Sequence, residues 1–361
     1  MNTLRKPTPP RRGPILWACC LGLMMTASDL PAWQDGSTEN GKPSARQWCT
    51  WQPADDRSAL PGSGKTIVLI SGDEEYRSEE ALPMLGQMLA ERLGFTCHVL
   101  FAIDPESGEI DPNQQGNIPG MHLLDEADLV IMALRFRNLP DQQMQHFHRY
   151  LNAGKPLIGL RTSTHAFRYP GDYDGPYARY GTDSREWPGG FGKQVLGETW
   201  VSHHGHHGSQ STRGVIDHER QDHPWLTGVD DVWGPTDVYG IRELPDNATV
   251  LLWGQVIDGM QPDDPAVEGE QNDPMMPLAW VRDYPTESGK VSRVFCTTLG
   301  AATDFQSEGL RRLVANAALG LSGREDRIDE RVNVDPAGPY EPTDFGFNRF
   351  REGLRPADYQ D

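Results

Sequence analysis

The pattern of apolar and polar positions changes sharply near residue 65. Residues 66–71 form a largely apolar run between two glycines, as expected of a strand buried on both faces. Residues 78–94 follow with leucines at helical spacing and a glycine at the end. The pattern therefore predicts a buried strand followed by a helix.

Apolar strands and amphipathic helices continue to alternate up to residue 160. Strands are predicted over 97–102, 128–134 and 156–160, and a helix over 140–154 has proline at its start and glycine past its end. This alternation is typical of a parallel sheet with helices on both faces. We therefore expect an α/β fold with a mainly parallel sheet.

The second half is less regular, but it extends the same domain. A helix is predicted over 305–321, where apolar residues share one face. Further strand candidates lie at 213–217, 237–243, 248–257, 277–283 and 291–299. Residues 65–321 are therefore interpreted as one α/β domain.

Both ends of the chain lie outside this predicted domain. Residues 1–32 combine a basic start, a short apolar stretch and small residues, which is typical of a signal peptide; an uncleaved anchor is the alternative. The apolar stretch is shorter than the roughly 20 residues of a membrane-spanning helix. We expect an exported, periplasmic or secreted protein with no stable membrane span after signal removal. Residues 33–64 are interpreted as a linker or N-terminal arm, and 322–361 as an extended C-terminal tail.

Charge and cysteine content narrow the functional classes. A net charge of −19 would repel phosphate backbones, so nucleic-acid binding is not expected. Three cysteines remain after the signal, and Cys97 and Cys296 lie inside apolar strand candidates, where a thiol behaves as a small buried hydrophobe. Cysteine chemistry is therefore not expected.

Polar residues follow directly after three predicted strands. In open parallel sheets, ligands bind outside the carboxyl ends of the strands. The candidate site residues at these ends are Glu75, Tyr76, Arg135, Arg137, Arg161, Thr162 and His165. Ordinary solvated loops would also be polar and are the alternative. Ser163 lacks the small flanking residues of a nucleophile elbow, which disfavours a serine hydrolase.

Four of the eleven histidines lie within five residues, at 203, 204, 206 and 207. Imidazole moves protons near neutral pH and is a common metal ligand. His203 and His207 are candidate ligands of a divalent transition metal, although no HExxH motif occurs. A solvent-exposed turn is the alternative. Farther along, His223, Asp237 and Tyr239 suit sugar hydroxyls and an apolar sugar face, or else a core ring and a turn cap.

The ordered set of these segments resembles the ThuA-like (trehalose utilization) family, in a signal-bearing subgroup. The likeness covers roughly residues 65–320. It rests on Ser71-Gly72, Gly159-Leu160, Asp222-His223-Pro224, Asp237-Val238-Tyr239, Pro277-Leu278-Ala279-Trp280 and residues 292–300. The chain has Arg161 and Ala301 where many relatives have histidine.

The resemblance implies a flavodoxin-like sheet of the class I glutamine amidotransferase type, without the cysteine of those enzymes. It also implies a role in carbohydrate breakdown, with keto-sugars as plausible substrates.

Two functions are consistent with these features. The first is a hydrolase, lyase or isomerase that acts on a sugar or keto-sugar by acid/base chemistry. Its expected catalytic residues are His203, His204, His165, Arg161, Glu75 and Asp237. Its expected substrate contacts are Tyr76, Arg135, Arg137, Thr162, His207, His223 and Tyr239. The second is a non-catalytic carbohydrate-binding or complex-forming protein, indicated by ten tryptophans and the aromatic loop at 168–190. A homo-oligomer is compatible with both.

Overall fold

The computed structural model of the chain describes residues 47–53 and 59–360. The expected signal peptide, residues 1–32, lies outside the described residues, as does most of the expected N-terminal arm. No helix within the described residues is both long and apolar enough to cross a membrane.

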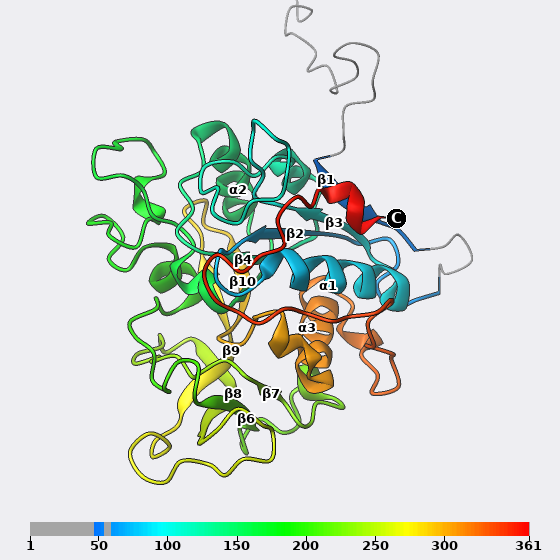
Figure 1. Ribbon diagram of the computed structural model, residues 1–361, viewed down its shortest axis with the longest axis vertical. Coiled ribbons are helices and arrows are strands. Elements are labelled where there is room, and N and C mark those ends of the chain that lie inside the picture. The colour runs from blue at the N-terminus through cyan, green and yellow to red at the C-terminus, as the bar shows by residue number, and fades with distance from the viewer. Residues whose placement is uncertain (1–46, 54–58, 361) are drawn as a thin grey trace, which may run out of the picture. The chain divides into compact units, whose positions relative to one another are not determined.

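Ten strands of the described chain form one mixed sheet in the order β1-β3-β2-β4-β5-β10-β9-β8-β6-β7 (Figure 1). Its centre is parallel. The five central strands are β3 (Thr96–Leu100), β2 (Thr66–Gly72), β4 (Leu129–Leu134), β5 (Leu157–Leu160) and β10 (Val291–Thr297). Numbered in chain order, they follow the flavodoxin-like arrangement 2-1-3-4-5. The expected α/β fold is confirmed.

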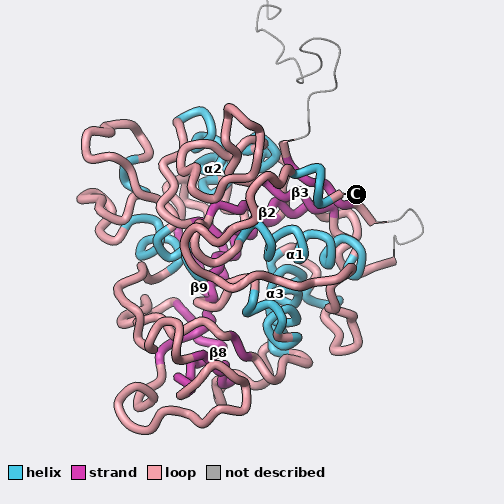
Figure 2. The backbone as a smooth tube through the Cα atoms, viewed as in Figure 1, coloured by secondary structure: helices cyan, strands magenta, loops and turns pink. Residues whose placement is uncertain are grey.

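Helices cover both faces of this parallel centre. α1 (Ser78–Leu93) and α3 (Glu308–Leu321) pack on one face, and α2 (Asp141–Asn152) packs on the other (Figure 2). Strand β2 shows why its sequence is apolar throughout. Ile67 and Leu69 enter the core beneath α1 and α3, while Val68 and Ile70 enter the core beneath α2.

Beyond β10 the sheet continues as antiparallel strands. These are β9 (Met276–Pro285), β8 (Ala248–Ile257), β6 (Ser211–Ile216) and the short β7 (Trp233–Gly234). The strand predicted over 237–243 is wrong: Tyr239 makes only an isolated bridge to His203. The carbonyl groups of Asp237 and Val238 bind a guanidinium and loop amides, so they are not available for a ladder.

The opposite edge of the sheet also differs from the prediction. β1 (Trp48–Trp51) pairs antiparallel with β3, so the linker interpretation of 33–64 does not hold for this segment. Cys49 is fully buried there, and Gly86 of α1 leaves room for the Trp51 ring. Because these side chains pack against the domain, residues 48–51 form an edge strand although the surrounding sequence is polar.

The C-terminal tail crosses α1 and ends beside β1 (Figure 1). Two short 3-10 turns, η7 (Glu325–Arg327) and η8 (Pro356–Tyr359), interrupt it. Its end is held where Tyr359 stacks on Phe101 with ring centroids 5.7 Å apart and Gln360 donates a 2.7 Å hydrogen bond to the Thr50 carbonyl. The end of the tail is thus bound to the edge of the sheet at β1 and β3.

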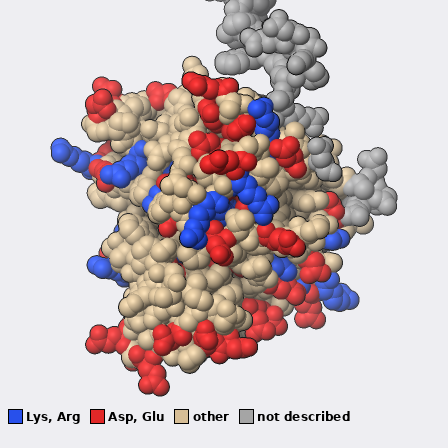
Figure 3. All heavy atoms as spheres, viewed as in Figure 1, with Lys and Arg blue, Asp and Glu red and all other residues tan. Residues whose placement is uncertain are grey.

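Acidic side chains are spread over the face shown in Figure 3 and gather along its lower edge, near β6 and β8. Lysines and arginines lie among them in smaller groups. A surface of this kind repels polyanions.

The burial of Cys49, Cys97 and Cys296 generates a prediction about their reactivity. Burial raises the pKa of the Cys49 thiol to about 12, and it also raises the pKa of Cys97 and Cys296. We expect all three to resist a maleimide at neutral pH, because the thiolate is the reacting form, and to react after unfolding in guanidinium. Peptide mass spectrometry would locate the label. Equal labelling rates in folded and unfolded protein would contradict this placement of the strands.

Candidate functional site

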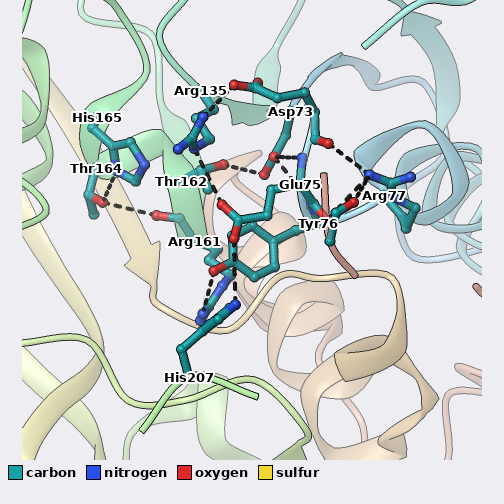
Figure 4. Close-up of polar contacts among 12 residues, drawn as sticks. Asp73, Glu75, Tyr76, Arg77, Arg135, Arg161, Thr162, Thr164, His165 and His207 are labelled. Atoms are coloured by element: carbon teal, nitrogen blue, oxygen red, sulfur yellow. Dashed lines mark hydrogen bonds and ion pairs between the residues drawn. The ribbon is translucent and has the colours of Figure 1, made fainter. Parts of the chain in front are cut away.

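The segments that follow β2, β4 and β5 meet at the carboxyl edge of the sheet, as predicted (Figure 4). The Asp73 carboxylate organises the first of them. One oxygen accepts hydrogen bonds from the amides of Glu75 and Tyr76, at 2.8 and 3.2 Å. The other accepts a 2.6 Å hydrogen bond from the Thr162 hydroxyl. Thr162 therefore ties the end of β5 to the end of β2, and its buried hydroxyl is committed to that role.

The two arginines after β4 have different roles. Arg137 is fully buried, and it donates to Glu74 at 2.7 Å and to three backbone carbonyls. This arrangement makes Arg137 a structural cation. Arg135 pairs with Glu74, and its Nε lies 3.5 Å from Glu75, with 18% of its side chain exposed. Arg135 is therefore the arginine of this pair that a ligand can reach.

Arg161 lies at the centre of the site in a left-handed backbone conformation, with φ of 37°. Its guanidinium carbon lies 4.2 Å from the ring centroids of both Tyr76 and Tyr239, and thus makes two cation–π contacts. Its two Nη atoms donate to Thr298, to Asp237 and to the Tyr76 hydroxyl. The side chain is 1% exposed, and both Nη atoms donate to protein groups. Arg161 therefore positions other groups, which corrects its expected role as a catalytic residue.

The Asp237 carboxylate binds two imidazoles and the Arg161 guanidinium. Oδ2 lies 2.6 Å from His203 Nδ1, and Oδ1 lies 2.9 Å from His207 Nδ1 and 3.1 Å from Arg161 Nη2. Burial alone would raise the pKa of Asp237. The hydrogen bonds from the histidines and the charge of Arg161 outweigh burial and hold this pKa well below its usual range.

The ionised carboxylate fixes the histidine tautomers. A carboxylate can only accept, so His203 and His207 each donate their Nδ1 proton to Asp237. In the neutral rings this leaves a lone pair on each Nε2 atom. The two side chains are 34% and 36% exposed. Two oriented imidazoles therefore face the accessible side of the site, where they can accept or deliver protons.

Glu75 lies between Arg135 and His207 (Figure 4). Its Oε1 lies 3.6 Å from His207 Nε2. Burial and the neighbouring Asp73 raise the pKa of Glu75. The hydrogen bond to Asp237 raises the pKa of His207 against the opposing effect of burial. Both groups therefore retain a proton at higher pH than they would in water.

His165 is near the cluster but is set among rings. It is 3% exposed and contacts the rings of Phe136, Trp200 and Tyr239, with centroids 4.9, 5.4 and 6.4 Å away. Burial and the nearby arginine charges lower its pKa well below the usual range. His165 is thus a neutral packing residue with a hydrogen bond to Thr164.

Two predicted histidines make their contacts elsewhere. His204 Nε2 lies 2.8 Å from the carbonyl oxygen of Gln271, so its ring secures a loop. His223 Nδ1 accepts a 3.2 Å hydrogen bond from the amide of Trp225 and caps the 3-10 turn η5 (Pro224–Leu226). The structure does not bring either imidazole into contact with Asp237.

Sequence reasoning missed several residues that position the site. Asp73 and Glu74 lie in a segment recognised as polar, but only their partners across the sheet reveal their roles. Asp304 is fully buried and accepts hydrogen bonds from Thr236 and from the amides after β10, which fixes the backbone just before Asp237. No local pattern distinguishes it from a helix cap.

Three donor groups could hold a metal ion. His203, His207 and Asp237 offer ligand atoms that all lie within 4.8 Å of one another. Nitrogen and carboxylate donors suit a divalent transition metal. The predicted histidine pair is therefore the pair that the structure brings together.

Replacing Asp237 by asparagine tests how much the cluster contributes to the free energy of unfolding. The change leaves the buried Arg161 charge uncompensated, so we expect the free energy of unfolding to fall by about 3–5 kcal/mol. The pKa of His207 is higher in the folded protein than in the unfolded chain, so His207 stabilises the fold at pH values below its unfolded pKa. This stabilisation is lost as the pH rises through its pKa in the folded protein. Urea unfolding should therefore show a larger deficit near pH 6 than near pH 9. A deficit that grows with pH would contradict this arrangement.

Comparisons with known proteins bear on these residues. The ThuA family model, described as trehalose utilisation, matches residues 113–319. A ThuA-like protein of Parabacteroides merdae ATCC 43184 is 17% identical, over 72% of this chain and 90% of that one, with a TM-score of 0.46. One from Bacteroides uniformis ATCC 8492 is 14% identical, over 71% and 91%, with a TM-score of 0.44. No curated protein matches.

The family match begins after α1, so Glu75 and Tyr76 lie outside it, as does the tail. Arg161, the two oriented histidines and Asp237 lie within it. The description of the family links its members to carbohydrate utilisation. Because the match spans more than half of the 361 residues, this chain belongs to the ThuA family.

Proposed function

We propose that this protein acts on a sugar or keto-sugar by acid/base chemistry, with His203 and His207 as the proton-transferring groups. The observation that carries the proposal is the buried Asp237 carboxylate, which orients both imidazoles towards the accessible side of the site. The family's link to carbohydrate utilisation supports the substrate class. The signal-like residues 1–32 support action outside the cytoplasm.

His203 is suited to the role of base. Its Nε2 lone pair would take a proton from a sugar hydroxyl or from the carbon beside a keto group. The Nδ1 proton stays between the ring and Asp237, whose negative charge stabilises the imidazolium that forms. The carboxylate itself does not need to take up the proton.

Glu75 and His207 are suited to the role of acid. The pKa of each group is raised, so each holds its proton to a higher pH than it would in water, and the 3.6 Å separation of Glu75 Oε1 and His207 Nε2 places both at one point of the site. Either group could deliver its proton to a carbonyl or leaving oxygen. The accessible Arg135 beside Glu75 would favour negative charge on that oxygen.

One base and one acid on the same sugar ring suffice for isomerisation or elimination next to a carbonyl. We therefore propose an isomerase or lyase that acts on a keto-sugar, with hydrolysis as the alternative reaction.

The second candidate function, non-catalytic sugar binding, was indicated by the aromatic residues of the loop at 168–190. Its rings pack on one another instead: Tyr169 stacks on Tyr173 at 4.6 Å, and Tyr180 is buried against Trp187.

A divalent transition metal at the same cluster is a second proposal, favoured by the close donor atoms of His203, His207 and Asp237. His203 and His207 would each supply an imidazole nitrogen and Asp237 a carboxylate oxygen. The metal would then polarise a carbonyl or bound water.

The acid/base proposal predicts a specific loss of turnover. On keto derivatives of disaccharides, His203→Ala and His207→Ala should each lower kcat by about 10²–10⁴-fold, measured at a temperature where both variants are folded by circular dichroism. His146→Ala is the matched control, because His146 on α2 forms a similar 3.0 Å pair with Asp125, away from the cluster. Full turnover in both cluster variants would rule out this chemistry.

The metal proposal is tested without any substrate. Purified protein dialysed against zinc should retain about one equivalent by elemental analysis, and His203→Ala and His207→Ala should lose it. The His146→Ala protein should behave as the wild type. Zinc retained equally by all four proteins, or by none, would exclude a metal at this cluster.

A further inference from the structure

The C-terminal tail forms part of the wall of the site, although the family match ends at residue 319. It is held to the segment after β2 by backbone and side-chain contacts. The Gly346 amide donates a 2.7 Å hydrogen bond to the Glu75 carbonyl, and Arg77 Nη2 donates to the Gly346 carbonyl at 2.8 Å. The Glu80 carboxylate accepts from the amide and hydroxyl of Thr343, at 2.7 and 2.8 Å. This stretch is therefore docked firmly.

Docking places one aromatic ring beside His207, a proposed acid, and a second ring beside Arg135. The Phe345 ring lies 5.6 Å from the Tyr76 ring and 5.4 Å from the His207 ring, between centroids. The Phe347 ring lies 4.9 Å from the guanidinium carbon of Arg135. The tail thus adds an apolar surface next to the polar groups that transfer protons.

Phe347 is unusual because it is exposed. It is 51% exposed and is one of three exposed large apolar residues in the described chain, with Val201 and Val291. The exposed Phe347 ring lies against the Arg135 guanidinium, and Phe345, two residues earlier, lies against the His207 ring, so apolar ring surface adjoins hydrogen-bonding groups. A pyranose has the matching character, because its C–H face is apolar and its hydroxyl rim is polar.

We infer that Phe345 and Phe347 form a platform for the apolar face of a sugar ring, with Arg135 and His207 at its polar rim. The inference rests on the proposed function and assigns a substrate-binding role to the tail. It predicts a preference for saturated rings over open-chain polyols, because only a ring offers a flat C–H face.

Calorimetric titration with trehalose and a keto derivative of trehalose tests the platform. Phe347→Ala and Phe345→Ala should each weaken binding by about three- to tenfold, whereas Phe347→Trp should retain it. Phe347→Leu keeps an apolar contact with Arg135 but removes the flat ring, and it should bind as weakly as Phe347→Ala. Val291→Ala is the matched control, since Val291 is 56% exposed on β10. Sorbitol should bind more weakly than either disaccharide.

The outcomes separate this inference from the proposed function. Unchanged affinity in both phenylalanine variants, with turnover still dependent on His203, would overturn the platform and leave the acid/base proposal standing. A changed elution volume of Phe347→Ala in gel filtration, with unchanged sugar affinity, would assign the ring to a protein contact and also overturn the platform. Failure of the wild type to bind either sugar would overturn both.

Discussion

The buried ion pair between Arg161 and Asp237 is the interaction on which the site depends. Both side chains are at most 1% exposed, and a buried ion pair depends on hydrogen bonds from neighbouring groups to offset the loss of water. Here the guanidinium lies between two tyrosine rings, and the carboxylate accepts from two imidazoles. The partners that satisfy the buried charge are therefore the same groups that face the accessible side.

The sheet topology explains how these partners meet. In the 2-1-3-4-5 order, the carboxyl ends of β2, β5 and β10 lie along one edge, and Arg161 follows β5 directly. It reaches Tyr76 after β2 and the carbonyl of Thr298 after β10. Asp237 comes from the irregular segment before β8, which enters this edge instead of extending the sheet. One cation thus joins three strand ends to the histidine loop.

The pattern of apolar residues predicted the elements whose burial depends on their own sequence. A run such as 66–71 is apolar at every inward position on both faces, so its burial could be read directly. The segment 237–243 was also predicted to be a strand, but its carbonyl groups bind partners elsewhere in the chain, which no local pattern records. Likewise, Arg161 was expected to meet substrate because it follows a strand. Its burial depends on an aspartate 76 residues later. The tail illustrates the same limit, since Phe345 acquires its position through hydrogen bonds between the tail and the segment after β2.

The orientation of the site depends on the Nδ1 protons of His203 and His207, and nitrogen-15 NMR of histidine-labelled protein locates these protons directly. If Asp237 orients the site, His203 and His207 will carry their protons on Nδ1 when neutral, and Asp237→Asn will abolish that preference. Protons on Nε2 of both rings in the wild-type protein would contradict the account.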